Sequence, residues 1–421
     1  MSRVLLIGRG PLPSPTQRTT GFAQLRTQHF LDVLRAADHA VDLLLIEEDE
    51  APGLLERGRQ LARAADLVVA AGPHRPGAVA VAVCGDRPLW VDLPGDPLAE
   101  LHALQQAPGA AVPPARIAAA QAAAIAALSR ADHLSVISDR QRHAVLGQLG
   151  VLGRLSGKTP PIATIPIAYR FPIPAAAPRP LPAEGPVRLL LVGAVAPWLD
   201  DERLASALDL ALARDPRLQV IATGGGVPGH YEAGAARLER WAQRSPNAAR
   251  IDLRGWVPQT ELEAILRTAH VGLCLDRPGF EPELGSRTRL LLYAWMGIPI
   301  AASPTCALAA ELADADLLTP LPAGAPAETL AETILGLTSR PPTPERTARA
   351  DRHLRERFAP ANISGALTRF ADAPFRTDPI VPPAARLAAE VESLRGQLAD
   401  IHRSPTWRTL SRLHRLLRPG D

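Results

Sequence analysis

The sequence predicts an α/β fold built on parallel sheets and divided between two Rossmann-like domains. Helical patterns alternate with short apolar runs at Ile251–Leu253, Val271–Leu275 and Ile298–Ala302, as crossover helices alternate with parallel strands. A second strand–loop–helix series begins afresh at Val187, after a proline-rich stretch. The length of 421 residues is that of two ordinary domains plus short additions.

Composition indicates a soluble globular protein, since 47% of the residues are hydrophobic and 21% are charged. The net charge of +3 provides no field for nucleic acid, which we exclude as a partner. Lys158 is the only lysine, so phosphate binding would depend on arginine and backbone groups. Cys84, Cys274 and Cys306 lack metal-like spacing, and we expect buried reduced thiols and no metal site.

The chain carries no sign of export or of a membrane span. Its first residues, MSRVLLIGRG, enter a strand directly, and their apolar run is too short for a signal peptide. No segment approaches the ~20 apolar residues that cross a bilayer. We therefore expect a cytoplasmic protein, or one held at the inner face of the membrane.

The first domain is predicted over residues 1–170. Gly8-Arg9-Gly10 after the first strand resembles a dinucleotide fingerprint, but Pro11, Pro13 and Pro15 prevent the helix that should follow, so we do not expect nicotinamide binding. The predicted strands are Arg3–Ile7, Val41–Ile46, Leu67–Ala70, Leu89–Asp92 and Leu134–Ile137, and the predicted helices include 21–35 and Pro114–Arg130.

Prolines divide the rest of the chain. We predict a hinge at 171–186, a second domain at 187–345, closing helices at 346–373, a linker at 374–383 and a helical tail at 384–421. The second domain begins with strand Val187–Val192, helix 201–214 and strand 218–222.

One helix of the second domain is marked at both ends. Ser286 is the predicted N-cap, and Gly297 followed by Pro299 ends the helix. Arg287 and Arg289 stand in its first turn, where free backbone N–H groups and the helix dipole also favour an anion. The sequence therefore predicts a phosphate site at this helix N-terminus.

These segments resemble the nucleotide-binding domain of GT-B glycosyltransferases, specifically the bacterial retaining group 1 enzymes. The resemblance is carried by Gly255-Trp256-Val257-Pro258, an acid at Glu281 or Glu283, and the helix Ser286–Pro299. It covers most of the chain and implies a GT-B architecture, with two Rossmann-like domains facing across a cleft and a C-terminal helical tail added. The chain departs from the family at Leu292, where the family has an acid that binds ribose, and at Leu199, where it has a lysine.

The resemblance implies transfer of a sugar from a nucleotide diphosphate donor to a glycan or lipid-linked acceptor, in bacterial surface polysaccharide synthesis. It implies retention of configuration without metal or another cofactor. The implied catalytic acids are Glu281 and Glu283, and the implied donor-binding residues are Gly193, Trp198, Val257, Pro258, Ser286, Arg287 and Thr288.

Loops of the first domain add acceptor-side candidates. His74 follows a strand and is either a catalytic residue or a surface-loop histidine. Arg18 and Arg26 either bind an anionic acceptor group or are solvated, and Asp96 follows the next strand. Gly224-Gly225-Gly226, in the second domain, either allows a close backbone approach or is a mobile turn.

Two other functions remain open. Leu292 and Leu199 favour a non-catalytic GT-B relative that acts as a binding or scaffold subunit, since both replace donor-binding groups. A further alternative is another GT-B activity, such as epimerisation of a sugar nucleotide.

The tail has two patterns. Leu387, Val391, Leu394, Leu398 and Ile401 form a short heptad seam, weakened by Gly396, which predicts weak self-association. Residues 403–421 combine arginines with leucines and Trp407, which fits an anionic membrane surface or, alternatively, a solvated or protein-docking helix.

Overall fold

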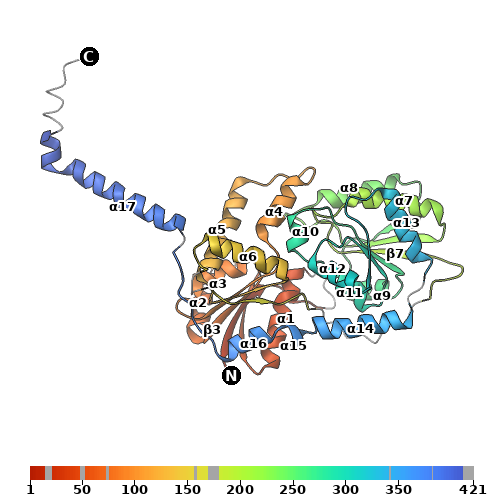
Figure 1. Cartoon of the computed structure of the whole chain (residues 1–421), viewed down its shortest axis with the longest axis horizontal. Coiled ribbons are helices and arrows are strands. Elements are labelled where there is room, and N and C mark those ends of the chain that lie inside the picture. Colours follow the sequence, from red (N-terminus) through yellow and green to blue (C-terminus); the bar gives the residue numbers. More distant parts are fainter. Residues whose placement is uncertain are drawn as a thin grey trace, which may run out of the picture.

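The structure is a computed structural model that describes residues 1–14, 21–47, 53–72, 75–155, 159–168, 180–340, 343–381 and 383–410. Two six-stranded sheets form the centres of two domains that lie side by side (Figure 1). All strand pairings in the described parts of both sheets are parallel. The predicted α/β class is confirmed.

The first sheet has the strand order β2-β1-β3-β4-β5-β6. Its strands are β1 Arg3–Arg9, β2 Ala40–Ile46, β3 Leu67–Ala71, β4 Leu89–Leu93, β5 His133–Val136 and β6 Ile162–Thr164. The helices between them are α1 Phe22–Ala36, α2 Leu54–Ala64, α3 Arg75–Val83, α4 Pro97–Gln106, α5 Pro114–Arg130 and α6 Asp139–Val151. The central strands are buried on both faces, which explains their unbroken apolar runs.

The second sheet has the order β12-β11-β10-β7-β8-β9. Its strands are β7 Val187–Val192, β8 Leu218–Thr223, β9 Ile251–Leu253, β10 Val271–Cys274, β11 Ile300–Ala302 and β12 Leu318–Pro320. Its helices are α7 Asp201–Arg214, α8 Ala233–Arg244, α9 Gln259–Leu266, α10 Phe280–Leu284, α11 Thr288–Trp295, α12 Ala307–Asp314 and α13 Ala327–Thr338, with a 3-10 turn at Ala248–Arg250.

The start of α11 differs from the prediction. The helix begins at Thr288, with Arg287 at the N-cap position and no side-chain cap, so the prediction that Ser286 caps it is wrong. Arg287 has the non-helical backbone angles φ −120° and ψ 88°, as an N-cap residue does, and its side chain contacts preceding acids. The other end is as predicted, since Gly297 has φ +64° and follows the C-cap.

The chain returns to the first domain after the second sheet. Helix α14 Pro344–Phe358 packs on the second domain, and α15 Pro360–Ile363 and α16 Gly365–Asp372 lie on the first (Figure 1). Leu367 and Phe370 of α16 are buried in the core that contains β1 and α1. The Ser2 hydroxyl donates to the Ala371 carbonyl over 2.6 Å. Helix α16 therefore completes the first domain.

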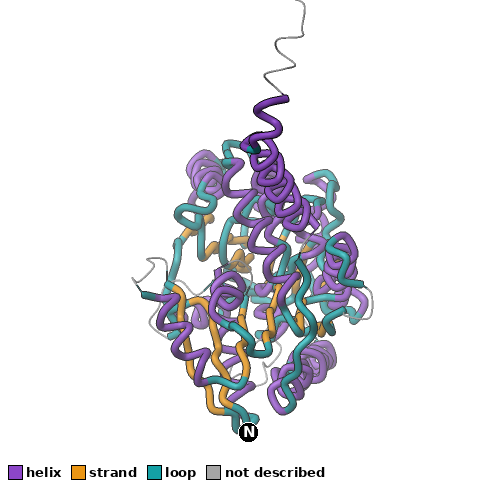
Figure 2. The backbone as a smooth tube through the Cα atoms, turned by 90° about the vertical axis from the view of Figure 1, so that its left-hand side faces the viewer, coloured by secondary structure: helices purple, strands orange, loops and turns teal. Residues whose placement is uncertain are grey.

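Residues 374–381 of the predicted linker at 374–383 form neither helix nor strand, as expected of a linker, but they are bound to the first domain. The Thr377 amide donates to Asp132 Oδ1 over 2.7 Å, and the Ile380 amide donates to the Ser129 carbonyl over 3.1 Å. Helix α17 Pro383–Arg403 follows and projects away from both domains in Figure 1, while in Figure 2 it lies in front of the body and its far end rises above it. Most of the predicted hinge at 171–186 lies outside the described residues.

Candidate functional site

The two domains meet through α4 of the first domain and α10 of the second, which pack against each other. Tyr231 of the second domain is buried with Leu104 and Ala107 of the first. The Arg140 Nη1 group donates to the Thr305 carbonyl over 2.5 Å, again between domains. The loops that follow the strands of the second sheet therefore lie against α4 and α6 of the first domain.

The loop after β7 and the glycine run after β8 are joined by their backbones. The Gly193 amide donates to the Thr223 carbonyl over 2.8 Å, and the Val195 amide donates to Gly225 over 2.9 Å. Gly224 has φ +95°, and a Cβ atom there would lie 2.2 Å from the Gly193 oxygen. The glycine run thus serves a close backbone approach, and its partner is Gly193.

The Gly-Trp-Val-Pro segment adjoins this pair of loops. Gly255 has φ +62°, and its carbonyl accepts from the Gly224 amide over 2.7 Å. The Trp256 indole N–H donates to the Gly226 carbonyl over 3.0 Å. Val257 and Pro258 follow, half-buried, at the start of α9. The predicted donor-binding residues Gly193, Val257 and Pro258 are thus on adjoining loops.

Arg289 brings a cation to the first of these loops. It lies in the first turn of α11, and its Nη2 group donates to the Ala194 carbonyl over 2.9 Å. Leu199, where the family has lysine, is buried with Val195 and Leu238. A guanidinium from another element therefore stands beside the loop that lacks its own cation. The sequence indicates that Arg289 lies at a helix start, but it does not indicate the contact with the Ala194 carbonyl.

Arg287 is the centre of a buried ion-pair network. Its side chain is about 4% exposed, and its Nε group donates to Asp276 Oδ2 over 2.7 Å. Its Nη2 group donates to Glu281 Oε2 over 2.6 Å, while Nη1 donates to Glu281 Oε1 and to the Ser286 carbonyl. Its guanidinium carbon lies 5.2 Å from the centre of the Trp198 ring. Most donors of this predicted phosphate ligand are engaged within the protein.

Of the two candidate acids, only Glu281 belongs to this network. Its side chain is buried, which raises the pKa of its carboxyl, and the adjacent Arg287 guanidinium opposes that rise. Glu283 is exposed, two residues further along α10 and so on another face of the helix. Ser286 and Thr288 are half-buried on either side of Arg287.

Asp276 was not among the predicted residues. It lies two residues beyond the end of β10, is buried, and accepts from Arg287 and, over 3.3 Å, from the Thr305 hydroxyl. Its Oδ1 atom has no hydrogen-bond partner among the described residues. An acid at the carboxyl end of a strand was the available signal, since ligands of α/β sheets bind there.

Glu100 of α4 is the second residue that the sequence did not indicate. It is half-buried at the contact between α4 and α10. Burial, followed by the negative charges of Glu281 and Asp96, raises its pKa to about 7. Nothing local distinguishes Glu100 from other helical acids, because its environment comes from the opposite domain.

Arg26, predicted on the acceptor side, is buried within the first domain. It is about 2% exposed and forms a double hydrogen bond to Asp92, at 2.8 and 2.9 Å. It also donates to the carbonyls of Ile165 and Pro166. The alternative that Arg26 is a solvated surface residue is wrong, and its guanidinium is already paired with a carboxylate. Arg18 and His74 lie outside the described residues.

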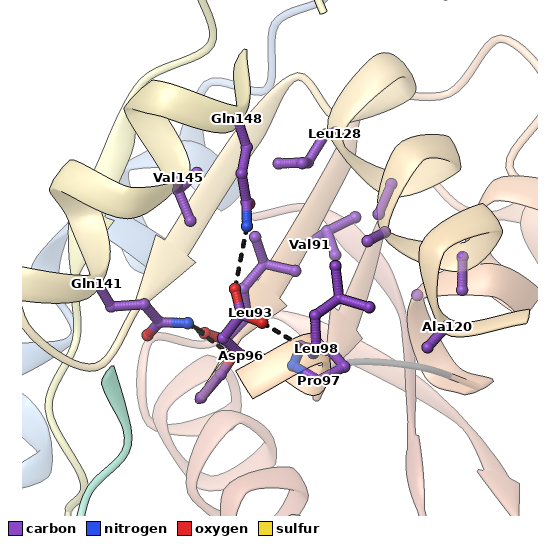
Figure 3. Close-up of a pocket in the computed structure, with 15 residues that line it drawn as sticks. Val91, Leu93, Asp96, Pro97, Leu98, Ala120, Leu128, Gln141, Val145 and Gln148 are labelled. Carbon is purple, nitrogen blue, oxygen red and sulfur yellow. Dashed lines mark hydrogen bonds between the residues drawn. The ribbon is translucent and has the colours of Figure 1, made fainter. Parts of the chain in front are cut away.

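Asp96 caps α4 and lies beside a small cavity (Figure 3). Its Oδ1 atom accepts from the amides of Leu98 and Ala99, at 2.8 and 3.0 Å, and its Oδ2 atom accepts from Gln148 over 3.0 Å. The cavity is lined by residues of β4, α4, α5 and α6, among them four alanines of α5, and holds about 30 Å³, which is room for a water or two and not for a sugar. Asp96 therefore positions α4, the helix that carries Glu100.

Neither a membrane span nor a metal cluster is found in the described parts of the chain. None of the helices there is both long and apolar enough to traverse a bilayer. The same residues contain no group of three or more His, Cys, Asp or Glu side chains placed to hold a metal ion. The three cysteines are buried and unpaired with one another, as predicted.

Comparison with known proteins gives similarity in structure and none in sequence. No protein-family model and no curated protein sequence matches the chain. Sucrose-phosphate synthase from Thermosynechococcus elongatus superposes with a TM-score of 0.63 and 16% identity, covering 89% of this chain and 100% of that one. HepE from Anabaena, in complex with UDP-glucose, gives 0.60 and 15% over 89% and 100% of the two chains.

A third structure has the same two-domain arrangement. The UDP-forming α,α-trehalose-phosphate synthase from Burkholderia vietnamiensis superposes with a TM-score of 0.61 and 12% identity, over 87% of this chain and 98% of that one. These proteins span nearly the whole described body, and both of its sheets match the architecture of the GT-B neighbours. The chain therefore has the GT-B fold.

Proposed function

We propose that this protein is a glycosyltransferase that takes a sugar from a nucleotide diphosphate donor. The proposal is supported by the GT-B fold and by similarity to HepE, whose structure contains UDP-glucose. It is supported equally by the loops after β7, β8 and β9, which adjoin one another at the carboxyl end of the second sheet.

The observation that carries the proposal is the position of Arg289. Its guanidinium lies against the Gly193–Ala194 backbone, at the N-terminus of α11. A diphosphate at this place would meet a cation, free amides of the first helical turn and a loop without side-chain bulk. Negative charge grows on the diphosphate as the glycosidic bond breaks, so these groups stabilise the transition state more than the bound donor.

The buried acids supply the opposite charge. Positive charge develops at the anomeric carbon during transfer, and a nearby carboxylate stabilises it. Asp276 Oδ1 has no hydrogen-bond partner in the part of the chain that the structure describes, and Glu281 lies on the other side of Arg287. We assign these two acids to the sugar side of the site and Arg287 to holding them in place. Val257 and Pro258 are assigned to the base through their backbone groups.

The finer assignments rest on the family resemblance. They are retention of configuration, independence from metal, a glycan or lipid-linked acceptor, and a role in bacterial surface polysaccharide synthesis. Product analysis of the anomeric configuration tests the first, and turnover in the presence of a chelator tests the second.

Arg289→Met tests the donor site. It removes a charge-assisted contact worth about 1.5–3 kcal/mol, so binding of the preferred nucleotide diphosphate should weaken by roughly 10- to 150-fold. The matched control is Arg240→Met, which removes an exposed arginine of α8. Calorimetric titration with a panel of nucleotide diphosphates provides the measurement. Equal affinity in the parent and in Arg289→Met would remove Arg289 from the site.

A non-catalytic GT-B relative is the second candidate. It is favoured by Leu292, which is about 5% exposed and packed in the core of the second domain, so that no acid reaches the ribose from this position. The two functions separate in one assay. Tight binding of a nucleotide sugar, with neither transfer of the sugar nor slow hydrolysis of the donor, would favour the binding subunit. Release of nucleoside diphosphate would establish the enzyme.

We also propose that residues 403–421 hold the protein at the cytoplasmic membrane face. Within the described part of this segment Trp407 and Leu410 are exposed, next to Arg403 and Arg408. Deletion of 403–421 should release the protein from vesicles that contain anionic lipid, and high salt should have the same effect. Binding that is insensitive to salt would favour a protein-docking helix.

A further inference from the structure

Helix α17 carries a row of aliphatic side chains that nothing in the described structure covers. Its members are 40–66% exposed, although each is large and apolar: Leu387, Val391, Leu394, Leu398 and Ile401. The helix projects away from the body (Figure 1). A continuous apolar face of this kind marks an interaction surface, because water contact along it is unfavourable.

The spacing of these residues gives each a position in a heptad. Val391 and Leu398 occupy a, while Leu387, Leu394 and Ile401 occupy d. Gly396 then falls at f, on the outer face of the helix and 5 residues beyond Val391. The glycine lowers helix propensity by about 1 kcal/mol but leaves the seam without a gap. Gly396 therefore weakens the seam only by lowering the stability of the helix, and it removes no apolar side chain from the contact face.

We propose that a second copy of this chain covers the seam, forming a parallel two-stranded coiled coil. The flanking charges argue for the parallel arrangement. Glu390 occupies g and Arg395 occupies e, so in a parallel pair each Glu390 faces the partner's Arg395, and the contact forms twice. In an antiparallel pair g faces g, and the g positions Glu390 and Gln397 offer no cation.

Arg395 can change partners at little cost. Within its own helix its Nη1 group donates to Glu392 Oε1 over 2.7 Å, but both side chains are about 70% exposed. Exposed pairs of this kind contribute little to stability, because solvent screens them. A contact with Glu390 of a second copy would lie beside the apolar seam and be partly shielded from water.

The seam residues favour two strands at its centre. A β-branched residue at a with leucine at d is the dimer combination, and Val391 lies between Leu387 and Leu394. The last two layers have Leu398 at a and Ile401 at d. Taken alone, leucine at a with isoleucine at d favours coiled coils of three or four strands. The molecular mass of the assembly therefore decides the number of strands.

The segment before α17 is attached to the first domain through the Ile380 amide, so association would join two whole bodies. Two heptads are short for a coiled coil, and we expect a dissociation constant near 10–100 μM. The full chain, without vesicles, should change from monomer to dimer mass across this range in sedimentation equilibrium. A monomer at all concentrations to about 0.5 mM, or a trimer or tetramer, would overturn the proposal.

Matched charge insertions locate the contact. Leu394→Glu places a carboxylate in the seam and should weaken association by at least about 100-fold. Ala399→Glu places the same charge on the outer face of α17 and should leave the dissociation constant within about threefold. Both positions are exposed in the single chain, so neither change should unfold it. Equal weakening by both, or by neither, counts against the seam.

A charge exchange tests the parallel direction. Glu390→Arg and Arg395→Glu each place like charges opposite each other in a parallel homodimer. A mixture of the two variants restores both pairs, so the mixed dimer should form on the order of tenfold more tightly than either variant alone. No preference for the mixed species would exclude the parallel register, even if the chain is dimeric.

Discussion

Replacing Arg287 with alanine is expected to damage folding more than ligand binding. The guanidinium is buried and holds two buried carboxylates, with distances of 2.7 Å to Asp276 and 2.6 Å to Glu281. The phosphate site that the sequence predicts at Arg287 would give the opposite balance, with a loss of nucleotide binding and a small effect on stability. The contacts reverse that expectation, because Arg287→Ala leaves two acids in the core without their counter-ion.

The magnitude follows from the buried charges. Removing one partner of a buried ion pair costs about 3–5 kcal/mol, because the remaining charge stays away from water. A domain of this size loses roughly 2–4 °C of melting temperature per kcal/mol, so the melting temperature should fall by about 6–20 °C. Arg289→Ala, which removes one contact to a carbonyl, should cost less than about 2 kcal/mol and provides the comparison.

The pH dependence gives an independent check. Burial raises the pKa of Glu281, and Arg287 opposes this rise. Without Arg287 the folded variant binds protons more tightly than the unfolded chain, so its stability falls as pH rises. The difference between the parent and Arg287→Ala should therefore be smaller at acid pH than at alkaline pH. Urea unfolding curves across this range measure it.

A neutral replacement of the network separates charge from packing. Arg287→Met combined with Glu281→Gln and Asp276→Asn removes the unpaired charges and should recover part of the lost stability. The reasoning would be refuted if the free energy of unfolding of Arg287→Ala lay within about 1 kcal/mol of the parent's while nucleotide binding was lost. Arg287 would then be a free ligand-binding group and not the centre of the network.

Three further predictions concern single positions. Leu292→Asp should destabilise the fold by about 3–5 kcal/mol without tightening nucleotide binding, because the side chain is in the core; denaturation and titration measure the two effects. Gly224→Ala should cost clearly more than Gly229→Ala in thermal unfolding, since both have positive φ but only Gly224 would meet backbone, 2.2 Å from its Cβ. The parent should lose stability as pH rises from 4.5 towards about 7, because the raised pKa of Glu100 makes the folded state bind more protons than the unfolded chain in this range. Glu100→Gln should abolish this loss in unfolding curves measured across the same pH range.

The fold was predictable where local chemistry decides structure. Helix α7 and strand β7 have the bounds that the sequence predicts, since prolines, glycines and the apolar period mark them. Strands β6 and β12 were not predicted. Each has three residues at a sheet edge, too few to show a period, and each is formed by pairing with the strand beside it.

The site was less predictable, because its partners are distant in sequence. Arg26 and Asp92 are separated by 66 positions, and no sequence pattern near either residue indicates that the two are paired. Arg287 was identified as a helix-start cation, but its pairing with acids on both sides depends on the loop between β10 and α11. Glu100 acquires its environment from α10 of the opposite domain. Local patterns locate such loops and do not tell which side chains they bring together.

The return of α16 to the first domain has a consequence for biosynthesis. Residues 187–358 contain all strands of the second sheet and helix α14, whose Leu354 and Phe358 are buried in its core, and they can fold as soon as they leave the ribosome. The first domain, although made earlier, lacks the side chains of Leu367 and Phe370 until the end of translation. Until then the face around Trp90 stays uncovered. The domain synthesised second is therefore expected to reach its native state first, and nascent chains stalled before residue 360 should present the first domain to chaperones.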